Sequence, residues 1–118
     1  MSLKEEIFAK AKELPRKEVP VAEWGCSVWI PKLTGAQGDE IAGDAAKRQR
    51  RNDFVGWRSY LIARCVQDDA GALIFDADSK DDLKNLQGMS NDSLEALSDE
   101  IMQYNNLGKK GLEDAEKN

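Results

Sequence analysis

The sequence predicts an α+β fold that is mainly α-helical, with a small N-terminal β-hairpin packed on a bundle of about four to five helices. Apolar residues recur at helical spacing in several segments, and one segment alternates like a strand. A chain of 118 residues can bury roughly two-thirds of its unfolded surface, but with 33% charged and 7% aromatic residues the core must be small. We expect one domain over residues 1–108 and a disordered tail over residues 109–118.

The first segment predicts a short helix. Ser2 and Glu5 have the spacing of a capping box, which opens a helix after Ser2. The apolar face of this helix comprises Leu3, Ile7, Ala11 and Leu14. Pro15 would end the helix, because proline disrupts a helix interior. We expect so short a helix to pack only loosely on the rest of the domain.

Residues 19–33 have the pattern of a β-hairpin. Pro20 confines the first strand to a sheet edge, because proline cannot donate to a central ladder, and the turn falls at residues 23–25. The second strand turns one face toward the helices, formed by Cys26, Val28 and Ile30. Trp29 points to the opposite face, where it would either form a lid over helix side chains or anchor a partner.

A second helix is predicted from residue 35 to about Arg48. Thr34 and Gln37 form a second capping-box pattern at its start. Its inward residues are expected to be Ile41, Ala42, Ala45 and Ala46. The basic run Lys47–Arg51 suits a helix C-terminus, where the helix dipole favours cations. Asn52 and Asp53 then provide a break and a cap for the next helix.

The helix predicted over residues 54–66 is the element around which the rest of the chain is organised. One face carries Phe54, Trp57, Leu61 and Cys65, and it is widened by Val55, Ile62 and Val66. Arg58 lies inside this apolar arc, so it needs a carboxylate partner or an open edge. Two interpretations remain: an internal ion pair or snorkelling stem, or a polar contact in a protein interface.

The remaining chain predicts a turn at residues 67–71, a short strand or extended plug at residues 73–75, and two helices. Ser79 caps the first of these helices, which ends at Gly88 and turns Leu83 and Leu86 inward. Ser90 or Asn91 caps the last helix. Its narrow apolar stripe is Leu94, Leu97, Ile101 and Tyr104.

The charges are divided unevenly along the chain. The net charge is −5, yet residues 1–66 carry 12 basic and 9 acidic residues, whereas residues 67–118 carry 5 and 13. The two parts thus have net charges of +3 and −8. Their attraction can close the fold within one molecule, or it can favour head-to-tail contact between copies. A broadly acidic chain is a poor general nucleic-acid binder. Lys47–Arg51, with Trp57 and Tyr60 nearby, would either touch phosphates and stack bases or serve a structural or partner-facing role.

The chemistry of the sequence points away from catalysis. It has no histidine, which removes His-based catalysis and most zinc sites, and it has no phosphate-binding or dinucleotide-binding glycine pattern. We therefore expect no enzyme, no cofactor and no metal. We also expect no membrane segment or signal peptide, hence a soluble cytosolic protein. An interaction protein is the class left by elimination.

Two smaller groups of residues have structural interpretations. Cys26 and Cys65 are far apart and lie among apolar neighbours, so we expect two reduced, packed thiols. Four aspartates, Asp76, Asp78, Asp81 and Asp82, superficially resemble a calcium loop. Counted from Asp76, that loop lacks the glycine at its sixth position and the bidentate glutamate at its twelfth, so helix capping is favoured over a cation site.

Taken in order, several segments resemble a known family. They are VPVAEWG at residues 19–25, VWIPKLTG at 28–35, LIARCVQDDAG at 61–71, LIF at 73–75, and the helix of residues 94–107 with its terminal Asn-Asn-Leu. Over about residues 15–108 the chain resembles the tail assembly chaperones of long-tailed (siphovirus) bacteriophages. Residues 1–108 would then form a single domain of that kind.

The resemblance implies a non-enzymatic morphogenesis factor of the host cytoplasm. Such proteins bind the tape measure protein, keep it soluble until the tail tube polymerises around it, and are absent from the mature virion. The family also implies a longer product, made by ribosomal frameshifting, that recruits tail tube protein. The lysines at Lys109–Lys110 or at Lys117 mark where a slippery sequence would lie.

To bind a largely helical client in that role, the chaperone itself needs apolar anchors held in a soluble, charged frame. We expect Trp24, Trp29 and Trp57 to be anchors and Arg58 to be a polar contact. The charge division would let several copies line up along the client as a homo-oligomer. Two alternatives stay open: a nucleic-acid-contacting packaging or regulatory factor that uses Lys47–Arg51, and a structural head–tail connector protein that is retained in particles.

Overall fold

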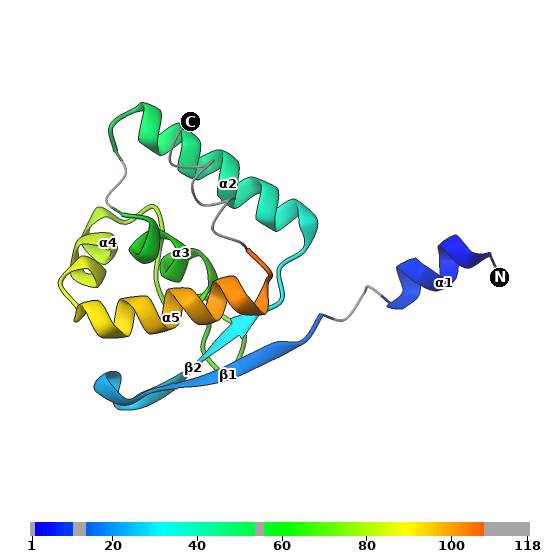
Figure 1. Ribbon diagram of the computed structural model, residues 1–118, viewed down its shortest axis with the longest axis horizontal. Coiled ribbons are helices and arrows are strands. Elements are labelled where there is room, and N and C mark those ends of the chain that lie inside the picture. The colour runs from blue at the N-terminus through cyan, green and yellow to red at the C-terminus, as the bar shows by residue number, and fades with distance from the viewer. Residues whose placement is uncertain (1, 11–13, 54–55, 108–118) are drawn as a thin grey trace.

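A computed structural model describes residues 2–10, 14–53 and 56–107 of the chain. Its elements are α1 (Leu3–Lys10), β1 (Arg16–Val21), a 3-10 turn (Ala22–Trp24), β2 (Cys26–Pro31), α2 (Gly35–Arg50), α3 (Trp57–Cys65), α4 (Lys80–Gln87) and α5 (Asn91–Tyr104). In Figure 1, α3 lies between α2 and α5, the hairpin runs along α5, and α1 stands apart from the other elements. The predicted α+β, mainly helical fold with an N-terminal hairpin is confirmed.

The core is built around α3, as predicted. Four consecutive α3 residues, from Tyr60 to Ala63, are at most 2% exposed, and Cys65 and Val66 are completely buried. The other elements contribute Val28, Ile30, Ile41, Ala45, Leu83, Leu86, Leu94, Leu97 and Ile101. Because α3 is covered on several sides, an apolar stripe around half of its circumference is what the fold requires. Phe54 and Val55, part of the predicted stripe, lie outside the described residues.

The hairpin has the predicted turn and edge. β1 and β2 are antiparallel in one register that pairs Val19 with Val28, and Gly25 closes the turn with a φ of 68°. Val28 and Ile30 face the core as expected, but Cys26 is exposed, so its expected packing is wrong. Cys26 pairs with Val21 at the end of the ladder, next to the turn. Only Cys65 is a packed thiol.

The segment 73–75 is neither a regular strand nor a buried plug. A single antiparallel bridge joins Trp29 to Gln67, and a second joins Gln67 to Leu73. Strand-like pairing therefore extends sideways from β2 through one residue pair at each step and forms no further regular strand. Leu73 and Ile74 are 56% and 44% exposed, while Phe75 is half-buried. Only the last of the three apolar residues therefore fills space beside the core.

α1 has no buried residue. The side chains of Leu3, Ile7 and Phe8 are between 55% and 71% exposed, so the described part of this helix does not bury its apolar face. The predicted helix reached Leu14, but Leu14 is non-helical and 41% exposed, and residues 11–13, with Ala11, lie outside the described residues.

The predicted caps of α2, α4 and α5 are confirmed. Thr34 and Gln37 form both hydrogen bonds of a capping box, Ser79 accepts from the Asp82 amide, and Ser90 accepts from the Ser93 amide. α2 continues two residues past Arg48. Its inward face is narrower than predicted: Ile41 and Ala45 are buried, Ala46 is half-buried, and Ala42 is exposed. The prediction that Ala42 points inward is wrong, because a step of one residue beyond Ile41 rotates the side chain by about 100° around the helix axis, away from α3.

The side chains of Asn105 and Lys32 join the end of α5 to the segment that follows β2, and we call this pair of contacts the clasp. The Asn105 side chain accepts from the Leu33 amide at 2.7 Å and donates to the Pro31 carbonyl at 3.2 Å. Beside it, the Lys32 ammonium donates to the Tyr104 carbonyl and lies 4.5 Å from the Tyr104 ring centre. Backbone groups that leave a strand need partners, and this asparagine provides them from another element.

Candidate partner-binding surfaces

The predicted anchor Trp24 belongs to the turn of the hairpin. Its ring meets Phe75 edge-on, with centroids 6.0 Å apart and an interplanar angle of 75°. Trp29, on β2, lies beneath the Arg16 guanidinium, which is 4.6 Å from the ring centre. Both tryptophans are half-buried. Arg16 covers the ring of Trp29, an arrangement that the lid and anchor interpretations did not include.

Trp57 and Arg58 begin α3. The Trp57 ring lies 6.2 Å from that of Tyr60, and Arg58 donates a hydrogen bond of 2.6 Å to the Asn91 side-chain oxygen. Arg58 therefore sits at an open edge with an amide partner instead of a carboxylate. Trp29 pairs with Gln67, two residues past the other end of α3, about 13 Å away along the helix. The predicted contacts thus occupy both ends of α3 and do not form one patch.

A cleft of about 490 Å³ opens beside α2, and we call it the α2 cleft. Its apolar lining is Leu33, Ile41, Ala63, Leu73 and Phe75. Its polar rim includes Arg64, which pairs with Glu40 at 3.1 Å. Because Trp24 packs against Phe75, one predicted anchor supports this cleft from behind. Apolar lining with a few fixed charges is the usual composition of a binding groove.

A polar network holds α2, one wall of the cleft, against the core. The Arg48 guanidinium donates to Asp44 at 2.9 Å, to the Ala77 carbonyl at 2.6 Å and to Asp78 at 2.7 Å. The Tyr60 hydroxyl donates to Asp44 at 2.7 Å. Arg48 is only 7% exposed, and its guanidinium also lies 4.9 Å from the Tyr60 ring centre. One arginine thus ties α2 to α3 and to the loop before α4.

The titration of the network follows from these contacts. Burial alone would raise the pKa of Asp44, but the Tyr60 hydrogen bond and the Arg48 charge together outweigh it, so the pKa lies below its ordinary value. Burial, and then the hydrogen bond to Asp44, raise the pKa of Tyr60. At neutral pH Asp44 is therefore a charged carboxylate and Tyr60 a neutral phenol.

This geometry reduces the number of side chains in Lys47–Arg51 that are free to contact a nucleic acid. Arg48 is buried in the network, and Tyr60, the expected base-stacking residue, is 2% exposed. Neither side chain can reach a nucleic acid without breaking the contacts that hold α2. Lys47, Arg50 and Arg51 are exposed. Within the described residues, the expected patch therefore loses one of its three arginines and one of its two aromatic partners.

The aspartate cluster acts within the chain. Asp82 accepts from the Asp76 amide at 2.8 Å, Asp76 accepts from the Asp78 amide at 2.9 Å, and Asp78 binds Arg48. Among the described residues, no group of three or more His, Cys, Asp or Glu side chains is placed to hold a metal ion. Burial raises the pKa of Cys65 to about 12, which keeps this thiol protonated and unreactive.

The most exposed large apolar side chains are ones that sequence reasoning did not select as partner contacts. They are Leu3, Ile7, Phe8, Leu14, Leu73, Ile74 and Met89. For 73–75, the available signal was its position: three apolar residues between a polar turn and an aspartate run, too short for a buried strand. The signal for α1 was the proline after it, which separates the helix from the hairpin.

No protein-family model, curated protein or solved structure matches the chain. Across the described ranges, every helix is too short or too polar to cross a bilayer.

Proposed function

We propose that this protein is a non-enzymatic tail assembly chaperone of a long-tailed phage. In this role it binds the tape measure protein, keeps it soluble while the tail tube assembles, acts in the host cytoplasm and is absent from the mature virion. The proposal rests first on the sequence resemblance over residues 15–108. A longer, frameshifted form would add the contact with tail tube protein.

The observation that carries the proposal is the apolar lining of the α2 cleft together with the exposed side chains of residues 73 and 74. Leu73, which lines the cleft, is 56% exposed, and its neighbour in the chain, Ile74, is 44% exposed, in a protein whose net charge is −5. Side chains of this kind in a charged frame can cover apolar residues of a helical client without the chaperone itself aggregating. Trp24 would act through Phe75, and Trp29, Trp57 and Arg58 are proposed as further contacts at the two ends of α3.

Co-expression tests the proposal directly. The protein should co-purify with the largest coiled-coil protein encoded beside its gene and should raise the soluble fraction of that client. Leu73→Asp with Ile74→Asp should abolish this effect, because two charges would be placed where apolar contact is needed. Asp69→Asn, in the same exposed loop, is the matched control and should leave client solubility unchanged.

Three outcomes would count against the proposal. A client that stays insoluble with the wild-type protein removes the chaperone role. Binding that survives the double substitution at residues 73 and 74 but is lost with Trp29→Ala or Trp57→Ala moves the site to α3. Retention of the protein in purified virions favours a connector, and an electrophoretic shift of DNA or RNA at physiological salt favours the nucleic-acid alternative.

A further inference from the structure

The helix α1 and a groove between β1 and α5 have complementary surfaces. The groove, which we call the β1/α5 groove, has a volume of about 590 Å³. Its apolar lining comes from Val19, Pro20, Val21, Ala22, Ala96 and Leu97. Four carboxylates complete the lining, on Glu23, Asp92, Asp99 and Glu100, and no lysine or arginine belongs to it. Glu100 is paired with Lys17 of β1 at 2.6 Å, so the groove is apolar at its base and keeps a net acidic rim that includes Asp92 and Asp99.

α1 carries the opposite pattern. At about 100° per residue, Leu3, Ile7 and Phe8 span an arc of about 140°. Lys4 falls inside that arc, and Lys10 lies about 20° outside it, next to Leu3. The acidic residues Glu5 and Glu6 fall on the opposite side of the helix. One face of α1 is thus apolar and basic, and none of its residues is buried in its own chain.

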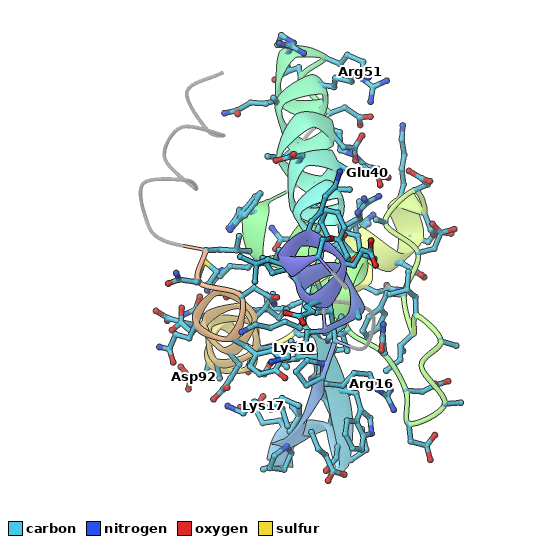
Figure 2. All side chains as sticks on the ribbon, turned by 90° about the vertical axis from the view of Figure 1, so that its right-hand side faces the viewer. Lys10, Arg16, Lys17, Glu40, Arg51 and Asp92 are labelled. Atoms are coloured by element: carbon cyan, nitrogen blue, oxygen red, sulfur yellow. The ribbon has the colours of Figure 1, made fainter. Side chains whose placement is uncertain are left out.

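The two surfaces also match in length. Eight helical residues span about 12 Å, and the α5 wall of the groove, from Asp92 to Gln103, spans about 16 Å. The direction of α1 favours a second molecule as the occupant. Leu14 and Pro15 are non-helical and continue β1 outward, so α1 projects from the body, toward the viewer in Figure 2. Figure 2 also shows Asp92 on α5, on the flank where Lys17 lies.

We propose that α1 docks into the β1/α5 groove of a second copy of this chain. If the exchange is reciprocal, each copy both gives and receives a helix, which closes a symmetric dimer and doubles the buried apolar surface. Leu3, Ile7 and Phe8 contact the apolar base of the groove, while Lys4 and Lys10 meet the carboxylates of Asp92 and Asp99. The contact is small, so the dimer dissociates in the micromolar-to-millimolar range.

Charge-reversal variants of the full-length protein test the proposal. Sedimentation velocity measures the mass of each protein over rising concentration at low salt. The wild type should shift from monomer toward dimer, and the shift should weaken at high salt. Lys4→Glu with Lys10→Glu should stay monomeric, and so should Asp92→Lys with Asp99→Lys. A mixture of these two proteins should recover the dimer, because each helix then meets a groove of opposite charge. Glu95→Lys, on α5 outside the groove, should dimerise like the wild type.

The outcomes separate this proposal from its rivals and from the proposed function, since no client is present. A wild type that remains monomeric at every concentration overturns it. A chain carrying all four substitutions again has a helix and a groove of opposite charge, so it should dimerise like the wild type; if it stays monomeric, the helix does not dock into a second copy, which also overturns the proposal. A dimer indifferent to both charge-reversed pairs would place the interface elsewhere. Circular dichroism of each variant confirms folding before its mass is interpreted.

Discussion

Replacing Arg48 by methionine should destabilise the protein far more than its position in a basic run suggests. Methionine keeps an apolar stem over the Tyr60 ring, but it removes the donors to Asp44, Ala77 and Asp78. A buried carbonyl left without a donor costs about 1–3 kcal/mol. The pairs to Asp44 and Asp78 add only about 1 kcal/mol, because those carboxylates are 29% and 87% exposed and recover water. We expect a total loss of about 2–4 kcal/mol.

Urea unfolding at pH 7, followed by circular dichroism, measures this loss. With a slope of about 2 kcal/mol/M, the midpoint should fall by roughly 1–2 M. Arg50→Met is the matched control, because it removes an exposed guanidinium from the same helix end and should change the free energy of unfolding by less than about 0.5 kcal/mol. Equal midpoints for Arg48→Met and Arg50→Met would refute the reasoning, since Arg48 would then be an ordinary surface cation.

Four further measurements check other parts of the structure. Because the pKa of Cys65 is raised from 9.0 to about 12, the folded state holds a proton that the unfolded state loses above pH 9; between pH 8 and pH 10 the wild type should therefore lose about 1.4 kcal/mol more stability than Cys65→Ala. In the native state only Cys26 should react with a thiol reagent, and urea should expose Cys65 as well. Gly25→Ala should destabilise by about 1–2 kcal/mol because of its positive φ, whereas Gly43→Ala, with open space around it, should stabilise by up to about 1 kcal/mol in the same urea assay. Asn105→Ala should cost about 1–3 kcal/mol, since it leaves the Leu33 amide without its partner; an unchanged midpoint would contradict the clasp.

The helices and the hairpin could be predicted because their signals are local. A threonine and a glutamine three residues apart determine the start of α2, and the alternation around Val28 determines which face of β2 is buried. The same reasoning fails for Cys26, because alternation gives the side that a residue faces but not whether another element covers it there. It also fails to predict the contacts made by segments 73–75 and α1.

The candidate surfaces depend on contacts between distant parts of the chain. Arg48 looked like one cation in a solvated run because two of its partners, Ala77 and Asp78, lie 29 and 30 residues further on. Sequence reasoning correctly judged that Arg58 needs a partner or an open edge, but it could not identify Asn91 as that partner. The α2 cleft combines residues from the segment between β2 and α2, from α2, from α3 and from the loop before α4, and no single segment carries its pattern.

The edge of the hairpin restricts how any partner can be recognised. β1 pairs only with β2 in the described sheet, and its outer edge carries Pro20 together with charged residues. Proline offers no amide hydrogen, and charges discourage an incoming strand, so β1 is a poor template for strand addition. On the other side, β2 meets Gln67 through a single bridge. Recognition through main-chain pairing is thereby disfavoured, and a partner must be read through side chains, the mode that suits a helix lying in a groove.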